Sequence, residues 1–484
     1  METYGLLSLL PPVIAIGLAL WTRQVFLSLF IGIWIGFVIL AGGNPIAGSF
    51  ATLDGLVSVF SNAGNTRIII FTLVVGALIA LIQRSGGVQG FIDRLLAWLN
   101  KSSDKATERG QRKRVELMAL FTGLVLFIES NISILTVGTL YRPVFDKLKI
   151  PREKLAYIAD SSSAPSCILL PFNAWGAFIT GLLMAQGLEH AFGELLKATL
   201  FNFYPMLVIA TLILVIVTGK DVGEMKTAEA RGSLLREGAM PMMSEEAASV
   251  PMKDGMTPRA RNMVIPIGAM VILMPVFLMM TGWSESGGNF FKALQSGSGS
   301  KSVLYATSLA CALAMIMYKL SGKLGIRESF DLSLKSMSAM VPLAILMVLA
   351  FAIGALCKEL GTGIYVAETA KAFISPALVP ALIFLVACFV AFSTGTSWGT
   401  FAIMIAIAVP LAQGMDTNVS LAIAAALGGG IFGDHCSPTS DTSIISSMAT
   451  ANDHIDHIRT QLPYALISGA ITTALYLVLG ALGV

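Results

Sequence analysis

The sequence predicts an all-α, polytopic membrane protein built as an inverted repeat, and three observations carry that prediction. The chain is 55% hydrophobic and only 13% charged, whereas an average soluble domain has about 25% charged residues. Apolar runs long enough to cross a bilayer recur from end to end. Basic residues gather in a few loops between these runs. The net charge of only +3 argues against nucleic acid as a partner.

The apolar segments differ in length. They lie near residues 4–21, 25–41, 68–83, 117–141, 155–188, 195–218, 263–281, 302–318, 338–357, 376–412, 419–449 and 463–484. Most of them fit one crossing, but 155–188, 376–412 and 419–449 are too long for one straight helix. We therefore expect these three segments to be broken or folded back.

Basic loops orient the first half of the chain. The loops 84–116 and 142–154 are both rich in Lys and Arg, which places both in the cytoplasm. The apolar segment 117–141 between them then enters and leaves on the same side. We expect a re-entrant hairpin whose tip is "FIESNIS", residues 127–133.

The second half predicts the opposite arrangement. The basic loop 319–336 is expected in the cytoplasm, whereas loops 358–375 and 413–418 are poor in Lys and Arg and are expected outside. The segment 376–412 would then be a second hairpin, entering from the other face. Its tip would be "FSTGTSWGT", residues 392–400.

The two halves therefore have the same plan in opposite orientations. Residues 1–218 form the first repeat with a broken helix at 155–188, and residues 263–484 form the second with a broken helix at 419–449. The linker 219–262 carries balanced charges and is expected to be a solvated cytoplasmic loop. Both chain termini are expected in the periplasm. Inverted repeats of this kind are typical of secondary transporters.

Polar residues interrupt the apolar segments at both hairpin tips and both helix breaks. A carboxylate at membrane depth costs about 2.5–3.5 kcal/mol, so it needs a partner, a cation or a proton. The candidates are Glu129, Ser130 and Asn131; Asp160, Ser161, Ser162 and Ser163; Thr394, Thr396 and Ser397; and Asp434, His435, Ser437, Ser440, Asp441 and Thr442. The symmetry of the halves predicts that these groups meet near the membrane midplane.

Helix-breaking residues accompany these candidates, namely Pro165, Pro438, Gly395 and Gly433. A proline within a helix would free the carbonyl of Ser161 or Asp434. Freed carbonyls, hydroxyls and carboxylates are hard oxygen ligands that suit Na⁺, which we expect at Asp160, Asp434 and Asp441. A buried carboxylate can hold either a proton or a cation, and that competition is sufficient for antiport.

Several of these residues also have a structural interpretation. Glu129 could be a paired structural carboxylate, His435 could bond locally, and the serine runs could be packing contacts between helices. His454 and His457 are expected to be solvated in a cytoplasmic turn. The stretch "GTSWG" (395–399) matches a serine-hydrolase pattern, but that pattern needs a strand-to-helix elbow. No enzyme activity and no ATP-driven pumping are expected.

The stretch "GDHCSPTSDTSIISS" (433–447) closely resembles the signature of the NhaC-type sodium/proton antiporter family, within the ion transporter superfamily. "FIESNIS" and "IADSSSAPSCILLPFNAWG" also resemble that family. The resemblance implies about ten transmembrane helices plus two opposed re-entrant hairpins, an elevator-like transport domain and a homodimer. It implies that Asp434, Ser437, Pro438 and Asp441, with Asn131 and Asp160, border the ion site. Family relatives exchange organic acids or amino acids.

The sequence thus predicts an ion-coupled secondary transporter of the bacterial inner membrane, a Na⁺/H⁺ antiporter whose partners are the lipid bilayer, Na⁺ and H⁺. No further cofactor is expected. The alternative is a Na⁺- or H⁺-coupled carrier of a small organic acid or amino acid. In that case Asn131, Asn173, Thr394 and Ser397 would hydrogen-bond the solute. A membrane-embedded enzyme is a third reading, which would need demonstrated turnover of a lipid or peptide.

Overall fold

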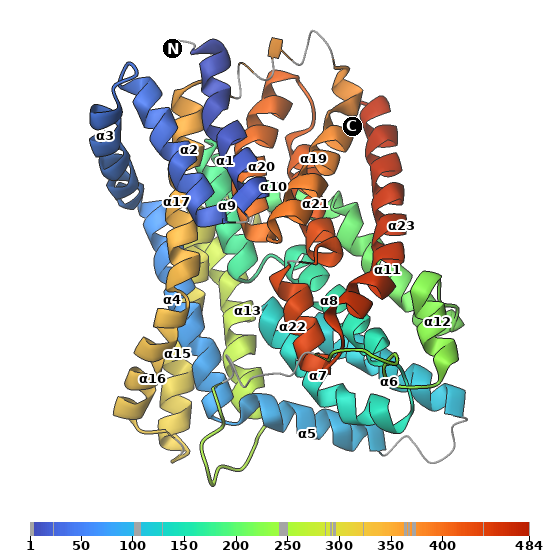
Figure 1. The fold of residues 1–484 in the computed structure, drawn as a ribbon. Coiled ribbons are helices and arrows are strands. Elements are labelled where there is room, and N and C mark those ends of the chain that lie inside the picture. Colours follow the sequence, from blue (N-terminus) through green and yellow to red (C-terminus); the bar gives the residue numbers. More distant parts are fainter. Residues whose placement is uncertain are drawn as a thin grey trace.

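The computed structural model describes residues 4–483, except 23, 101–107, 128, 242–249, 286, 291–292, 294–296, 323, 363–364, 366–367, 370–373 and 439. Throughout these residues the named elements are all helices, as Figure 1 shows. Nine of the described helices are long and apolar enough to cross a membrane, or up to 11 if each bent pair counts as one span. The expectation of an all-α, polytopic membrane protein is therefore confirmed.

The elements before the linker's end are η1 (Gly5–Leu9), α1 (Leu10–Thr22), α2 (Val25–Leu40), α3 (Pro45–Ser58), η2 (Val59–Ser61), α4 (Ala63–Arg84), α5 (Gly87–Asn100), α6 (Glu108–Val125), α7 (Ser130–Lys147), α8 (Arg152–Leu169), α9 (Ala174–Ala185), α10 (Ala191–Leu200), α11 (Phe203–Thr218) and α12 (Gly223–Arg231). Side-chain caps fix several starts, because the side-chain Oδ1 atoms of Asn44, Asn62 and Asn173 accept hydrogen bonds from backbone N–H groups of α3, α4 and α9. Gly219 ends α11 in a left-handed conformation with φ 66°.

The later elements are α13 (Arg261–Gly282), η3 (Trp283–Glu285), α15 (Gly299–Leu320), α16 (Ile326–Ala339), α17 (Val341–Glu359), η4 (Pro376–Leu378), α19 (Val379–Thr394), α20 (Ser397–Gly414), α21 (Val419–Cys436), α22 (Asp441–Thr450) and α23 (His454–Ala481). Asn418 and Asp453 cap the starts of α21 and α23. Gly395, with φ 69°, makes the turn between α19 and α20.

Two pairs of helices bend sharply. The chain bends by 119° between α2 and α3 and by 45° between α8 and α9. α3 lies between two predicted apolar segments, 25–41 and 68–83, and is not part of either. Its asparagine cap and Pro45 at the first turn start the helix. The segment 155–188 is α8 followed by α9, and the segment 419–449 is α21 followed by α22.

The helices pack as three apolar clusters. One cluster joins α9, α17, α19, α20 and α21 near the middle of the molecule. A second joins α4, α13 and α15, and a third joins α6, α7, α8 and α11. In Figure 1 the N and C labels both lie in the upper part of the molecule, on opposite sides, whereas α5 lies across the bottom beside α6. We call that lower side, which also carries the residue 219–262 linker, the linker end.

The linker is attached to the helix bundle, whereas the sequence predicts a solvated loop. Its first part forms α12, and Arg231 Nη2 donates to Glu153 Oε1 of α8 at 2.8 Å. Arg236 Nε pairs with Asp456 Oδ2 of α23 at 3.0 Å. The described part of this segment is therefore fastened to both halves, because its arginines meet carboxylates that are 1% and 8% exposed.

Candidate functional site

Asp160 lies near the middle of α8 and is completely buried. Its Oδ2 atom accepts hydrogen bonds from Ser443 Oγ at 2.9 Å and from Gln461 Nε2 at 2.7 Å. His457 Nε2 lies 3.9 Å from the same oxygen. Side chains of α22 and α23 thus surround a carboxylate of the first half, so the two halves meet at this residue.

Asp434 lies near the end of α21 and is also completely buried. Its Oδ1 accepts from the backbone N–H of Ser397 at 3.2 Å, at the first residue of α20. The start of a helix carries a partial positive charge, which stabilises a negative side chain there. The turn at Gly395 positions this N–H, so the tip between α19 and α20 holds Asp434 in place.

Ser443 connects the two aspartates. Its hydroxyl lies 2.9 Å from Asp160 Oδ2 and 2.7 Å from the carbonyl oxygen of Asp434. Gln461 makes a parallel link, since its Nε2 also reaches the carbonyl oxygen of His435 at 3.0 Å. The two carboxylates predicted from the sequence therefore belong to one buried polar cluster, which we call the aspartate cluster.

Three members of the aspartate cluster are not among the predicted site residues: Ser443, His457 and Gln461. The prediction that His457 is solvated is wrong, because His457 is fully buried and its Nε2 bonds to Gln461 Oε1 at 3.1 Å. The signal was present in the spacing. His457, Gln461, Tyr464 and Ser468 recur every three or four residues, so they share one face of α23.

Several buried polar atoms of this region have no hydrogen-bond partner among the described residues. They include one oxygen on each aspartate, Asp160 Oδ1 and Asp434 Oδ2, together with Asn131 Oδ1, Ser161 Oγ, Ser446 Oγ, Tyr157 OH and His435 Nε2. Buried polar groups are normally paired, because an unpaired one costs about 1–3 kcal/mol. Free carboxylate, amide and hydroxyl oxygens are the ligand types that a hard cation or a proton would satisfy.

The first hairpin tip lies against α8. Ser163 Oγ donates to Ser133 Oγ of α7 at 2.8 Å, and Ser133 reaches the carbonyl oxygen of Gly123 on α6 at 3.1 Å. A Cβ at Gly123 would lie 2.7 Å from Ser162 Cβ, so α6 and α8 approach closely. Ser130 is 2% exposed, whereas Glu129 and Asn131 are partly exposed. The structure thus brings this tip and the Ser161–Ser163 run together.

The residues after Asp434 form the start of α22. Ser440 caps this helix and its hydroxyl lies 3.0 Å from Thr442 Oγ1. Asp441 Oδ1 accepts from the N–H of Thr442 at 2.9 Å, and Ser437 is fully buried. His435 points elsewhere, since its Nδ1 lies 3.1 Å from Tyr204 OH of α11.

The other predicted hydroxyl and amide residues have local roles. Asn173 caps α9, and its Nδ2 lies within 2.8 Å of the carbonyl oxygens of Phe127 and Cys167, so it holds the α8–α9 bend against the hairpin tip. Thr394 Oγ1 donates to Val390 O one turn back at 2.9 Å. Thr396 precedes α20 without a side-chain cap.

The helix breaks lie partly where the sequence predicts them. Gly395 and Pro438 lie at breaks, between α19 and α20 and between α21 and α22. Pro165 lies inside α8, which continues to Leu169 before the break. Gly433 lies inside α21, where a Cβ would lie 2.6 Å from the backbone nitrogen of Phe392, so it permits close packing on α19. Because α21 ends at Cys436, Pro438 frees no helical carbonyl at Asp434; the chain turns there instead.

No group of three or more His, Cys, Asp or Glu residues that could hold a metal ion occurs among the described residues. The aspartate cluster is instead rich in hydroxyl, amide and carbonyl groups. These ligands suit a weakly held, exchangeable monovalent cation better than a resident transition metal.

Several known proteins are similar to this chain. An uncharacterized protein of Haemophilus influenzae is 31% identical over 492 residues, covering 98% of this chain and 90% of its own length. The malate-2H⁺/Na⁺-lactate antiporter of Bacillus subtilis is 30% identical over 108 residues, 22% of this chain and 23% of its own. The structure of the Alcanivorax borkumensis YdaH transporter has a TM-score of 0.60 at 15% identity, over 90% of this chain and 89% of that one. At that identity it shows the fold alone.

A family profile covers the part of the chain that contains most of the aspartate cluster. The profile described as the Na⁺/H⁺ antiporter family matches residues 177–481, which include Asp434, Ser443, His457 and Gln461. This is more than half of the chain. The match agrees with the resemblance that the Gly433–Ser447 motif indicated from the sequence. The chain therefore belongs to the Na⁺/H⁺ antiporter family.

Proposed function

We propose that the protein exchanges Na⁺ for H⁺ at the aspartate cluster, with Asp160 and Asp434 as the groups that bind cation or proton. The observation that carries this proposal is the pair of free carboxylate oxygens, Asp160 Oδ1 and Asp434 Oδ2, buried without a partner among the described residues. A buried carboxylate must be neutralised. A proton or a Na⁺ ion can do so, and each excludes the other.

The oxygens around the aspartates would complete a Na⁺ shell. Ser161 Oγ, Asn131 Oδ1 and the carbonyl oxygen of Asp434 are candidates. Na⁺ at Asp441 is a further element of the proposal. Complete burial of both aspartates means that the cluster is occluded, so transport requires a movement that exposes it to one side at a time. We place this movement in the hairpins and broken helices, as an elevator-like displacement.

The proposal also includes the orientation of the protein, its membrane and its oligomeric state. The first described residues and the C-terminal end of α23 lie at the end of the bundle opposite the linker. The basic loops at the linker end favour the cytoplasm for that side and the periplasm for the termini. We place the protein in the bacterial inner membrane, as a homodimer that acts as a transporter and not as an enzyme.

The test uses purified protein in liposomes that contain a pH dye. An imposed Na⁺ gradient should drive proton movement, and Asp160→Asn or Asp434→Asn should reduce it to the level of empty liposomes while the protein remains folded. Asp54→Asn, the same substitution at an exposed position of α3, is the matched control and should leave exchange unchanged. Full exchange by Asp434→Asn would contradict the proposal.

A second candidate is coupled transport of a small organic acid or amino acid. The cluster offers more polar atoms than one Na⁺ needs, including the unpaired Asn131 Oδ1, Ser446 Oγ and Ser161 Oγ. The Bacillus subtilis relative is named for malate and lactate as well as Na⁺ and H⁺. Proton movement that begins only after one carboxylate or amino acid is added to the same liposomes would favour this candidate over simple Na⁺/H⁺ exchange.

A further inference from the structure

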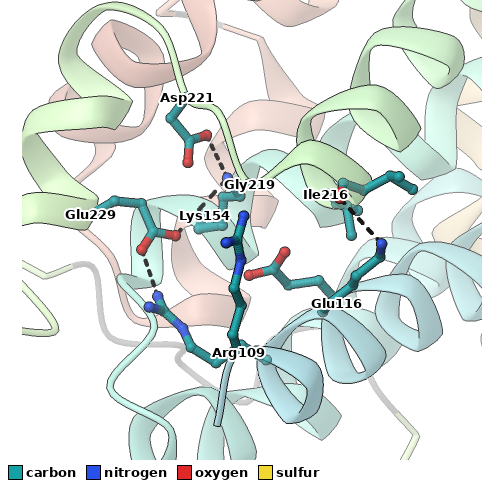
Figure 2. A pocket seen from close by; sticks show the side chains of 10 residues that line it. Arg109, Glu116, Lys154, Ile216, Gly219, Asp221 and Glu229 are labelled. Carbon is teal, nitrogen blue, oxygen red and sulfur yellow. Dashed lines mark hydrogen bonds and ion pairs between the residues drawn. The ribbon is translucent and has the colours of Figure 1, made fainter. Parts of the chain in front are cut away.

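A large polar pocket opens at the linker end, away from the aspartate cluster. Figure 2 shows its side chains converging from α6, α8, the end of α11 and α12. Its volume is about 450 Å³. The charged residues that face it are Arg109, Arg112, Lys113 and Glu116 of α6, Lys154 of α8, Asp221 after α11 and Glu229 of α12.

Ion pairs organise the inner wall of this pocket. Lys154, whose side chain is 2% exposed, pairs with Asp221, and Arg112 pairs with Glu229. Arg109 Nη2 and Lys113 Nζ donate to the carbonyl oxygens of Thr218 and Val217, each at 3.1 Å. Four basic side chains face three carboxyl groups around the opening, and the resulting small positive charge disfavours the entry of Na⁺.

Two stacked tyrosines lie inward of the pocket. Asp221 Oδ1 accepts from Tyr464 OH of α23 at 2.8 Å. The Tyr464 ring stacks on Tyr157 of α8, with ring centroids 4.6 Å apart and an interplanar angle of 17°. Both tyrosines line a second, narrow cavity together with Ser161, His435, Gln461 and Ser468. The stacked rings therefore lie between the outer pocket and the inner cavity.

The inner cavity reaches the aspartate cluster. Tyr157 OH, Ser161 Oγ and His435 Nε2, three of the groups that line it, have no hydrogen-bond partner among the described residues. Gln461, which also lines it, donates to Asp160 Oδ2 at 2.7 Å. Lys154, Tyr157 and Ser161 share one face of α8, as Gln461, Tyr464 and Ser468 share one face of α23.

We propose that this seam between α8 and α23 is a proton route from the linker side to Asp160, and that Na⁺ reaches the aspartate cluster another way. Once Asp221 is protonated, the Tyr464 hydroxyl, which donates to Asp221 Oδ1 in this structure, turns inward and accepts a proton from Asp221 as it gives its own proton to Tyr157. Tyr157 and then Ser161 each take up one proton and release another, the last of them to Asp160, so each hydroxyl ends neutral. Tyr157 OH and Ser161 Oγ have no partner among the described residues, so both are free to turn and bond in succession. Such a relay passes protons without a passage wide enough for a hydrated ion.

Glu116 suits the mouth of this route. It is 7% exposed in the polar part of α6, and burial raises its pKa from 4.5 to about 7 despite the opposing effect of Lys154. Such a carboxyl gains and loses protons near neutral pH. It can therefore exchange protons between solvent and the Lys154–Asp221 pair under the conditions in which the transporter would work.

The inference rests on the proposed Na⁺/H⁺ exchange, and two transport assays separate them. The first measures Na⁺-driven proton flux in liposomes, and the second measures exchange of ²²Na⁺ for Na⁺, which needs no proton. The variant is Tyr464→Phe, which removes the hydroxyl and keeps the stacked ring. We expect proton flux to fall by about 100-fold while Na⁺/Na⁺ exchange keeps its rate and its apparent Na⁺ affinity. Asp221→Asn should behave in the same way.

Tyr476→Phe is the matched control. Tyr476 is another buried tyrosine of α23, and its OH donates to Phe201 O at 2.9 Å, off the route. It should leave both assays unchanged. Unaltered proton flux in Tyr464→Phe, or an equal loss of both exchanges, would overturn the proton route. If the unsubstituted protein shows Na⁺/Na⁺ exchange but no proton flux, or shows neither, Na⁺/H⁺ exchange itself fails and the route with it.

Discussion

At the scale of single residues, the surroundings of a buried carboxyl group determine whether it is charged. Asp160 and Asp434 are buried within one hydrogen-bonded cluster, but Glu116 is buried at the rim of an open pocket. A carboxyl in that position is stable mainly in its neutral form. Its protonation therefore links the stability of the protein to pH.

Glu116 predicts that stability falls as the pH rises. Its folded pKa of about 7 lies above the ordinary value of 4.5. The contribution is thus fully present below about pH 4.5 and is lost as the pH rises through about 7; it amounts to about 3 kcal/mol. We expect Glu116→Gln to unfold at a higher temperature than the unsubstituted protein at pH 8 and at a similar one at pH 5. Thermal unfolding in detergent across this range measures it.

The control for this experiment is Glu224→Gln. Glu224 is an exposed glutamate on α12, so removing its charge should leave the pH dependence of unfolding as it was. An unchanged pH profile in Glu116→Gln would contradict the assignment of a buried, neutral carboxyl at that position.

At the residue scale, the sequence predicts site residues best where a charged side chain stands inside an apolar segment. A carboxylate in an apolar run is conspicuous, so Asp160 and Asp434 could be predicted as neighbours from opposite halves. Gln461 and His457 are harder to predict, because they lie in the first turns of α23, next to charged residues that resemble a solvated loop. Their spacing places them on one face of a helix, but only the packing of α23 against α8 turns that face inward.

At the scale of elements, close contacts between helices hold the aspartate cluster in place. α21 lies against α19, and Gly433 permits the approach. The sequence predicts a helix break at Gly433, because glycine is common at turns. The structure assigns it to helix packing, since the broken end lies three residues later at Cys436.

Gly433→Ala should therefore destabilise the protein although alanine favours helices. A Cβ there would overlap Cβ of Ala391, and displacing a packed backbone costs about 1–3 kcal/mol. We expect a lower unfolding temperature in detergent and weaker Na⁺/H⁺ exchange, because Asp434 is the next residue. Gly268→Ala on α13, where nothing lies within 4 Å of a new Cβ, should be neutral or slightly stabilising. Equal stability of the two variants would refute the packing argument.

At the scale of the whole molecule, the linker joins the two halves at the end that carries the polar pocket. The hydrophilic sequence of the linker predicts that it lies outside the bilayer. The attachment of the linker to α8 and α23 could not be predicted, because the partners of Arg231 and Arg236 lie about 80 and 220 residues away. These long-range pairs hold α8 and α23, the two walls of the seam, in their relative positions.

The two attachments should differ in strength. Arg231 is 23% exposed and pairs with Glu153, which is 1% exposed, so Arg231→Ala leaves a buried carboxylate unpaired and should cost about 2 kcal/mol. Arg236 is 51% exposed, and Arg236→Ala should cost less stability than Arg231→Ala because water replaces the guanidinium at Asp456. Chemical or thermal unfolding of the two variants side by side measures the difference. A larger loss in Arg236→Ala would reverse this ranking.

Ser443 has one hydroxyl proton and two acceptors, Asp160 Oδ2 at 2.9 Å and the carbonyl oxygen of Asp434 at 2.7 Å. It can satisfy only one of them at a time. When Asp160 is ionised, its charge attracts that proton, and the Asp434 carbonyl is left with its lone pairs free. When Asp160 is protonated, the hydroxyl turns back and covers the carbonyl. Rotation of a single bond thus presents a cation ligand in one protonation state and withdraws it in the other, without any movement of the backbone.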